Sequence, residues 1–243
     1  MRPHHPLHPM GMAFGLLLTL AGCATAQLQV PASFEATAQA LPVTGHSPRH
    51  FNEPIRIGPY SALELSDGGT FGWQLPVGAL DVGGRARDYA FTLVAIGQPP
   101  VEVQCRVASL ALGYDDHHGR VESRTELDLT ALSGPALGCG LHIDDGGEVS
   151  LLQLQRSGTR LDGRVGTPWG EATVHSVHAL QGAVVDTYAP AGFEIVLDGA
   201  PVAMVNAVNA GRVLLAPRLD DGQRSYFAAV AAALLLLGED AEA

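Results

Sequence analysis

The apolar run at residues 226–237 constrains the fold of this chain more than any other segment. It consists of a Tyr-Phe pair followed only by Ala, Val and Leu, and both Ala and Leu favour helix. Ser225 can cap such a helix and Gly238 can end it, which predicts a helix over 225–237. Because this helix is apolar on every face, it has to be buried on every face. The large side chains that this helix is expected to bury are those of Tyr226, Phe227, Val230, Leu234, Leu235 and Leu237.

The rest of the chain is rich in short strand-like segments. From residue 55 on, runs with β-branched and aromatic residues recur about every 10–15 residues. Gly, Pro and Asp separate these runs, as in residues 66–69, 144–147 and 198–199. Such spacing is typical of an antiparallel sandwich or barrel, and a closed barrel would bury the apolar helix on all sides. The sequence therefore predicts a mainly β fold, a barrel of about twelve antiparallel strands that encloses a hydrophobic C-terminal helix. The expected strands are residues 55–60, 70–75, 88–96, 101–108, 125–129, 137–143, 149–155, 161–165, 172–178, 193–197, 202–208 and 213–216.

The last 50 residues or so of the chain add a family resemblance. A strand pair at residues 192–205, a strand at 212–215 and the apolar helix follow one another. This order resembles the end of tubby-like C-terminal domains, a group that includes phospholipid scramblases and plant LURP-one-related proteins. The resemblance implies a twelve-stranded barrel wrapped around a central hydrophobic helix. Members that bind phosphoinositides use a Lys/Arg cluster; this chain has no Lys and no clustered Arg, so that binding is not expected here.

The first 22 residues have the form of a bacterial lipoprotein signal peptide. An uncharged apolar run from Gly11 ends in the sequence Leu-Ala-Gly before Cys23, as in a lipobox, although Arg2 is the one basic residue ahead of it. We therefore expect cleavage after residue 22 and acylation, including palmitate, on Cys23. A short buried helix is the alternative, but the His and Pro residues ahead of the run argue against it.

The lipid would decide where the protein resides. Two or more acyl chains anchor a protein stably to a membrane. Ala24 follows the cysteine, where lipoproteins held at the inner membrane of Gram-negative bacteria commonly have Asp, so we expect the outer membrane, with the domain facing the periplasm or the cell surface. Residues 23–50, rich in Ala, Thr, Gln and Pro, are predicted to be a lipid-anchored flexible linker, and residues 51–243 a single domain.

The charge balance limits the partners. With 14 basic residues, all Arg, and 25 acidic residues, the formal net charge is −11. An acidic surface repels nucleic acid, which is therefore not expected as a partner. The expected partners are the membrane, through the lipid on Cys23, and an envelope protein or ligand that the sequence does not identify.

Two cysteines remain besides Cys23. Cys105 and Cys139 lie in strand-like segments, and an exported protein meets an oxidising compartment, so we expect them to form a structural disulfide. On the chain-entropy model such a bridge stabilises the fold by about 3–4 kcal/mol. A pair of buried free thiols is the alternative.

The residues that could carry chemistry form only weak patterns. No nucleophile elbow, zinc-protease helix or phosphate-binding loop motif is present. Residues 115–118, Asp-Asp-His-His, are four potential metal ligands in a row, which cannot easily all face one ion, so a solvated loop tip is the preferred interpretation. His175 and His178 are three apart in a predicted strand and should point to opposite faces. We expect no metal site and no cofactor.

Three classes of function remain open. The preferred hypothesis is a non-catalytic envelope lipoprotein, a binding or structural module. A carrier of lipids or small ligands is an alternative, although a helix packed into the barrel would leave little space for cargo. The third is a hydrolase that uses His142 with Asp144 or Asp145.

Overall fold

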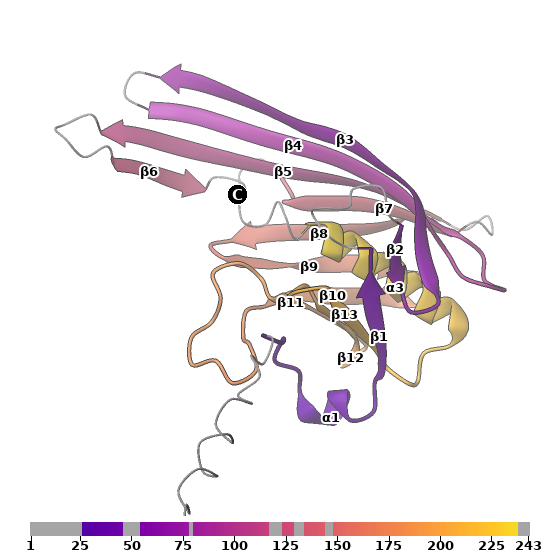
Figure 1. The fold of residues 1–243 in the computed structure, drawn as a ribbon. Coiled ribbons are helices and arrows are strands. Elements are labelled where there is room, and N and C mark those ends of the chain that lie inside the picture. Colours follow the sequence, from indigo (N-terminus) through magenta and orange to yellow (C-terminus); the bar gives the residue numbers. More distant parts are fainter. Residues whose placement is uncertain are drawn as a thin grey trace, which may run out of the picture.

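The structure is a computed structural model that describes residues 26–45, 54–77, 80–116, 123–128, 134–143 and 148–237, with the backbone alone for residues 77, 80, 112–116 and 123–128. It is mainly β, with one long helix at the C-terminal end (Figure 1). Its elements are α1 (Ala32–Glu35), β1 (Gln39–Thr44), β2 (Ile55–Ile57), β3 (Tyr60–Val77), β4 (Leu80–Val94), β5 (Val101–Asp116), β6 (Ser123–Asp128), β7 (Leu137–Ile143), β8 (Ser150–Ser157), β9 (Arg160–Thr167), β10 (Gly170–Val177), β11 (Gly192–Leu197), β12 (Ala200–Asn206), β13 (Arg212–Leu215) and α3 (Asp221–Leu237).

Twelve of the strands close into an antiparallel barrel, as predicted. Each strand pairs with the next one along the chain, with one exception: β5 pairs directly with β7, and β6 stays outside the ring. β13 returns to pair with β1, from Gln39 opposite Leu215 to Pro42 opposite Arg212, and this pairing closes the ring. Such a meander needs only short connections, which is why turn residues recur along the sequence. At the β11–β12 hairpin, Asp198 and Gly199 both have positive φ, as a two-residue hairpin turn requires.

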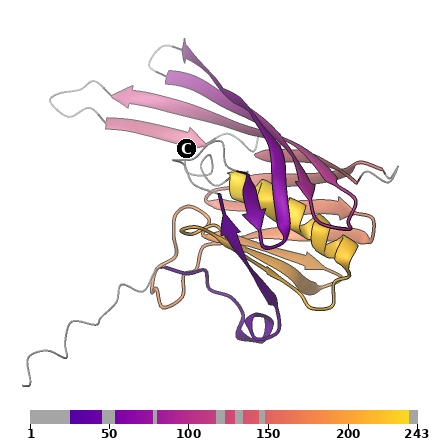
Figure 2. The ribbon, with the colours of Figure 1, turned by 45° about the vertical axis from the view of Figure 1, so that its right-hand side comes forward.

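Helix α3 occupies the interior of the ring (Figure 2). Every residue from Ser225 to Leu237 is buried, and the strands alternate buried and exposed residues around it, for example buried Ala172 and Val174 beside exposed Thr173 in β10. The prediction of a buried helix is therefore confirmed. The six large side chains expected in the interior are all buried: Tyr226, Phe227, Val230, Leu234, Leu235 and Leu237.

The start of the helix differs from the prediction. Helix α3 begins at Asp221, so Ser225 is a buried residue of its second turn and does not cap it. The cap is Asp220, whose Oδ1 accepts a hydrogen bond from the backbone N–H of Gln223 at 2.8 Å, while the Gln223 side chain accepts one from the N–H of Asp220 at 3.1 Å. This reciprocal pair is a capping box, which satisfies two N–H groups that a helix leaves unpaired. The expected end at Gly238 lies outside the described residues.

Part of the segment predicted to be a linker is instead folded. Strand β1 pairs with both β13 and β2 and supplies the buried residues Leu41 and Val43. Ahead of it, Leu28 is buried and forms a β-bridge with Leu180. The domain therefore includes residues 26–45, and the boundary predicted at residue 51 is wrong. In the sequence this strand is marked by only two alternating apolar residues, Leu41 and Val43, in a segment rich in Ala and Gln. That pattern is too short to predict a strand.

Three strands continue well beyond the barrel and form a projecting sheet (Figure 1). We call it the wing: residues 70–77 of β3, 80–87 of β4, 108–116 of β5, and β6. The turn expected at residues 66–69 is wrong, because β3 runs through this segment with two bulges, between Leu63 and Ser66 and between Asp67 and Thr70. The bulges accommodate Asp67, Gly68 and Gly69 without ending the strand, and Gly69 takes a positive φ of 73° there.

Candidate functional site

The interior of the barrel is closed by polar contacts at the C-terminal end of the helix. The hydroxyl of Tyr89 donates a hydrogen bond to the carbonyl of Ala233 at 2.8 Å, and Arg87 Nη2 donates one to the carbonyl of Leu236 at 3.4 Å. Arg87 also forms an ion pair with Asp67, at 3.3 Å between Nε and Oδ2. A cation at this position is favourable because the last carbonyls of a helix carry partial negative charge. These residues of β3 and β4 therefore fix the helix end rather than serve a ligand.

The other end of the helix is fixed by Tyr226. Its hydroxyl donates a hydrogen bond to the carbonyl of Gly166 at 2.8 Å, and its ring meets the ring of Trp169 edge-on with centroids 5.7 Å apart. Burial raises the pKa of Tyr226 to about 12, and a hydrogen bond with Ser150 offsets part of this effect. Both ends of α3 are thus tied to the barrel wall, and its side chains fill the space that a carrier would need for cargo.

The raised pKa of Tyr226 predicts an alkaline loss of stability. Between pH 10, the ordinary pKa, and the pKa of about 12 in the folded state, the folded chain holds a proton that the unfolded chain has lost. The stabilisation is therefore complete below pH 10 and falls by about 2–3 kcal/mol as the pH rises to 12. Urea unfolding at pH 9 and pH 11.5 measures it. The same series with Tyr226→Phe should lack this component; an equally steep loss in both proteins would contradict the assignment.

Cys105 and Cys139 form a disulfide, as predicted. They stand opposite each other in the register of β5 and β7, with their Cα atoms 4.1 Å apart, and both are buried. The bridge ties together two strands that are separated by the excursion through β6, and it belongs to the barrel wall rather than to a reactive site.

The other candidate residues from the sequence do not come together. His142 lies in β7, and its Nδ1 has no hydrogen-bond partner among the described residues; Asp144 and Asp145 lie outside them. His175 contacts Asp162 at 3.4 Å, whereas His178 contacts the carbonyl of Thr187 at 2.9 Å, so the two histidines serve separate local contacts. In the described part of the chain, no cluster of three or more His, Cys, Asp or Glu side chains could hold a metal ion. Of residues 115–118, the histidines lie outside the described residues, as does Cys23.

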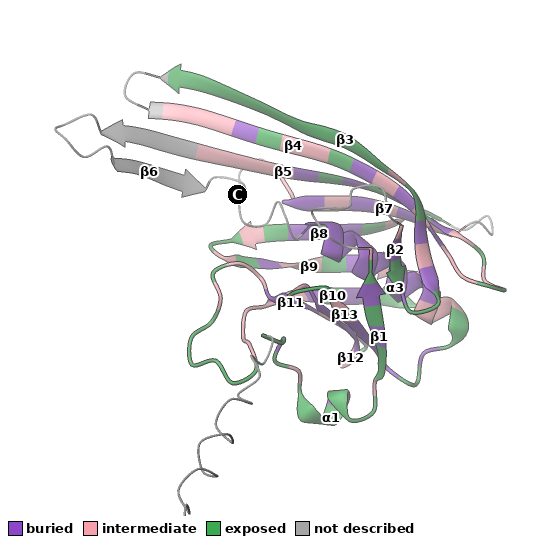
Figure 3. Cartoon of the chain, in the orientation of Figure 1, coloured by how far each residue is buried: buried purple, intermediate pink, exposed green. Residues whose placement is uncertain are grey.

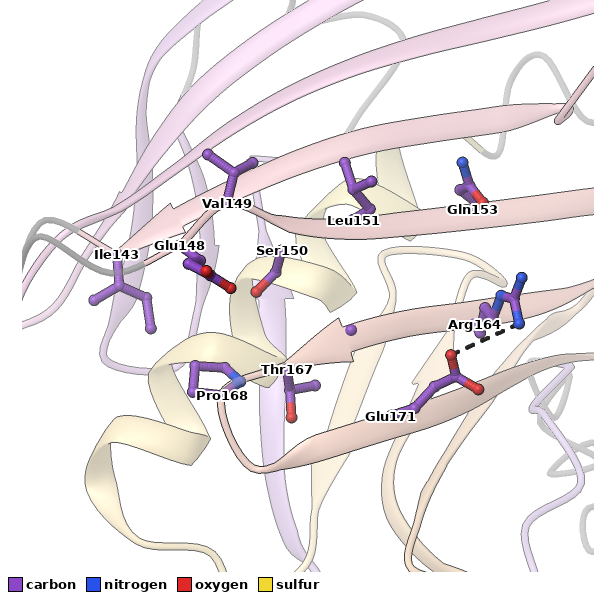
Figure 4. A pocket seen from close by; sticks show the side chains of 11 residues that line it. Ile143, Glu148, Val149, Ser150, Leu151, Gln153, Arg164, Thr167, Pro168 and Glu171 are labelled. Carbon is purple, nitrogen blue, oxygen red and sulfur yellow. Dashed lines mark ion pairs between the residues drawn. The ribbon is translucent and has the colours of Figure 1, made fainter.

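A groove of about 740 Å³ lies on the outside of the barrel (Figure 4). It crosses β8, β9 and β10. Exposed Val149 and Leu151 line one side of it, and an ion pair between Arg164 and Glu171, 3.7 Å apart, lines the other. Leu151 lies opposite Gly140 of β7 in the register, and Gly166 of β9 lines the groove beside it. Because neither neighbour has a side chain, the surface is hollow around Leu151. The groove offers apolar contact and one pair of charges, without a nucleophile beside a base.

In the wing, β3 exposes several large apolar side chains. Phe71, Trp73 and Leu75 alternate along this strand and are 70, 41 and 59% exposed. Figure 3 shows the projecting part of β3 in the colour of exposed residues. In the paired register they lie in rows with Ala86, Gly84 and Val82 of β4, and these rows continue to Ala108, Leu110 and Leu112 of β5. A Cβ on Gly84 would lie 2.8 Å from the Trp73 ring, so the indole rests directly on this glycine.

This apolar face lies on the outside of the wing. In the barrel, Tyr89, Phe91 and Leu93 of β4 point inward, and the positions that continue their face into the wing are Arg87 and Arg85. The apolar positions of the wing have the opposite phase. The alternation of apolar residues thus changes face within β4, and likewise in β5 between Val107 and Leu110. The strands predicted over residues 88–96 and 101–108 stop short of this change of phase, although the alternation that shows it is present in the sequence.

The wing also has a free edge. Strand β3 pairs with β2 only at Tyr60–Ala62, so within the described residues nothing pairs with its outer edge from residue 63 to its end. A long exposed edge strand can accept a strand from another chain. Pro76 at the tip has no N–H to donate, which limits such pairing to the part of the edge before it. Apolar side chains and free backbone groups therefore occur together on β3.

No helix in the described residues is long and apolar enough to span a bilayer. The chain matches no protein-family model, no curated protein and no solved structure.

Proposed function

We propose that this protein is a bacterial envelope lipoprotein, held at the outer membrane by acyl chains on Cys23, that binds a protein partner through the wing and has no catalytic activity. One observation carries the proposal: the barrel interior is filled by α3, while the outer face of the wing exposes Phe71, Trp73 and Leu75. Exposed apolar side chains on a regular surface are typical of interaction sites. Strand addition at the edge of β3 would supply backbone hydrogen bonds beside them.

The position of the wing supports a partner away from the anchoring membrane. In both views of the ribbon, the wing and the first described residues lie on opposite sides of the barrel (Figures 1 and 2). If Cys23 holds the chain at a membrane, the side of the barrel that carries residue 26 is the side that faces that membrane. The wing would then extend into the periplasm or the medium, where it can reach another envelope protein.

The alternatives find less support. A carrier would need space inside the barrel, where Phe227, Val230 and Leu234 already pack with no exposed surface. A hydrolase would need a carboxylate hydrogen-bonded to His142; Glu102 lies opposite His142 in the register of β5 and β7, but no described residue hydrogen-bonds its Nδ1. The outer groove remains a surface for a small ligand in addition to the wing.

The wing is tested by photo-crosslinking in cells. A benzophenone amino acid at position 71 is expected to give one dominant adduct with an envelope protein, because Phe71 is the most exposed large apolar side chain of this face. The same probe at Ile96, a fully exposed residue on the β4–β5 turn, is the matched control. Equal, diffuse labelling at the two positions would contradict the wing as the binding surface. Steady turnover of an envelope substrate by the purified chain would contradict the non-catalytic assignment.

A further inference from the structure

The loop between β10 and β11 carries the most exposed apolar residues near the N-terminal segment. Val184, Val185 and Tyr188 are 100, 78 and 79% exposed. Their exposure contrasts with the rest of the barrel surface, where outward positions are mostly polar or small. Asp186 is the single charged residue of the loop. Nothing in the fold itself needs these side chains in water, which suggests that they contact something else.

This loop is attached directly to the first residues of the domain. The backbone N–H of Gln181 donates to the carbonyl of Gln27 at 2.8 Å, and the N–H of Gln29 donates to the carbonyl of Ala179 at 2.9 Å. Leu28 and Leu180 form the β-bridge between these two bonds. The N-terminal segment and the base of the loop thus make a short two-stranded ladder. Farther along, the Asn209 side chain donates to the carbonyl of Ala26 at 2.7 Å and holds the start of the segment on the barrel.

The base of the loop is also closed on itself. The N–H of Thr187 donates to the carbonyl of His178 at 3.0 Å, and the His178 ring contacts the carbonyl of Thr187 at 2.9 Å. The N–H of Ala191 donates to the carbonyl of Val177 at 2.8 Å. These bonds fix both ends of the loop and leave Val184 and Val185 at its apex. The apolar side chains are therefore presented from a tethered base.

The distance from the acylation site to this ladder is short. Gln27 lies four positions after Cys23, and an extended chain covers at most about 14 Å over four positions. Val184 is three residues from Gln181 on the other side of the same hydrogen bond. A lipid on Cys23 would hold this residue at the level of the headgroups. The apex of the loop would then lie within reach of the membrane surface. The linker predicted over residues 23–50 would have allowed the domain to move far from the membrane, whereas the observed ladder does not.

We propose that the loop at residues 180–190 inserts Val184, Val185 and Tyr188 into the same membrane leaflet that holds the lipid on Cys23, so that the domain has a fixed orientation. The inference rests on the acylation in the proposed function. Aliphatic residues beside an aromatic one suit the boundary between headgroups and acyl chains, where a shallow apolar insertion of about 5–10 Å is stable. The acidic net charge of −11 favours zwitterionic over anionic lipid for this contact. The wing lies on the opposite side of the ring of strands from this loop, so insertion of the loop leaves the wing free for a partner.

The experiment uses the acylated full chain in phosphatidylcholine vesicles. A polarity-sensitive dye is attached through Val184→Cys, and in a second protein through Ile96→Cys as the matched exposed control. We expect a blue-shifted emission and quenching by lipids with quenchers on their acyl chains for the dye at position 184, and an aqueous spectrum at 96. In the unacylated Cys23→Ser chain, Val184→Ser should lower partitioning onto the vesicles by roughly tenfold, while Ile96→Ser should not change it.

Two results would overturn the insertion. The first is a dye at 184 that stays as aqueous as the one at 96 while the acylated chain is bound to vesicles. The second is a dye at 184 that is already shielded in a lipid-free dimer of the Cys23→Ser chain, which would make a second copy the occupant. A membrane-extracted chain whose mass shows no acyl groups would refute the proposed anchor instead. The loop would then be judged by the vesicle spectra of that unacylated chain, where an aqueous spectrum at 184 refutes insertion as well.

Discussion

Leu235→Asp is expected to abolish folding. The Leu235 side chain has no exposed surface and lies in the last turn of a helix that is buried on all sides. A carboxylate there would be charged without a partner in an apolar interior, at a cost of several kcal/mol, or would have to be protonated at a similar cost. Folded domains have a total stability of only about 5–15 kcal/mol. We expect the variant to be insoluble, or to give no cooperative transition in urea.

The matched control is Leu75→Asp on the outer face of the wing. This residue undergoes the same change of side chain but is 59% exposed, so the new charge stays in water. Its free energy of unfolding should remain within about 0.5 kcal/mol of the wild type. If Leu235→Asp unfolded cooperatively and with similar stability to Leu75→Asp, the helix could not be enclosed by the barrel.

Removing the disulfide has the second largest expected effect. The bridge closes a loop with a sequence separation of 34 residues, which on the chain-entropy model stabilises the fold by about 3–4 kcal/mol. The double substitution Cys105→Ala and Cys139→Ala should lower the free energy of unfolding by about that amount. Alanine is the appropriate replacement because both positions are buried and a serine hydroxyl there would need a new partner.

A reducing agent provides the control for the disulfide. Reduction should destabilise the wild-type chain by about as much as the double substitution does, and it should leave the double variant unchanged. Urea unfolding with and without dithiothreitol measures both. A wild-type chain that is insensitive to reduction would show that the two cysteines do not constrain the unfolded state as the bridge requires.

The barrel and its helix were predictable because their signals lie in the composition of single segments and in the spacing of strand-like segments along the whole chain. The run at residues 226–237 contains no polar residue, so burial on all sides follows from composition alone. Two cysteines in strand-like segments of a chain expected to be exported likewise indicate a bridge. The cap at Asp220 and Gln223 was missed, although its spacing is that of a capping box; Ser225, nearer to the apolar run, was the more obvious choice.

The contacts of the proposed surfaces depend on pairing that the sequence does not reveal. The hydrogen bond from Tyr89 to Ala233 joins residues 144 apart, and only the closed barrel brings them together. The ladder between Gln27 and Gln181 is equally remote in sequence. The apolar face of the wing has a local signal, the alternation of Phe71, Trp73 and Leu75. Its outward orientation, however, follows only from the register of β3 with β4.

Native and denaturing mass spectra of the same Cys23→Ser chain test the central claim most directly, that the barrel is filled by its own helix and binds its partner on the outside. The substitution removes the proposed acylation site, so any extra mass reports a retained ligand. The account predicts equal masses in the two spectra, with the Cys105–Cys139 bridge intact in both. A small molecule or lipid retained only in the native spectrum, and still retained when Val149 and Leu151 of the outer groove are replaced by Ser, would contradict it and identify the interior as a binding site.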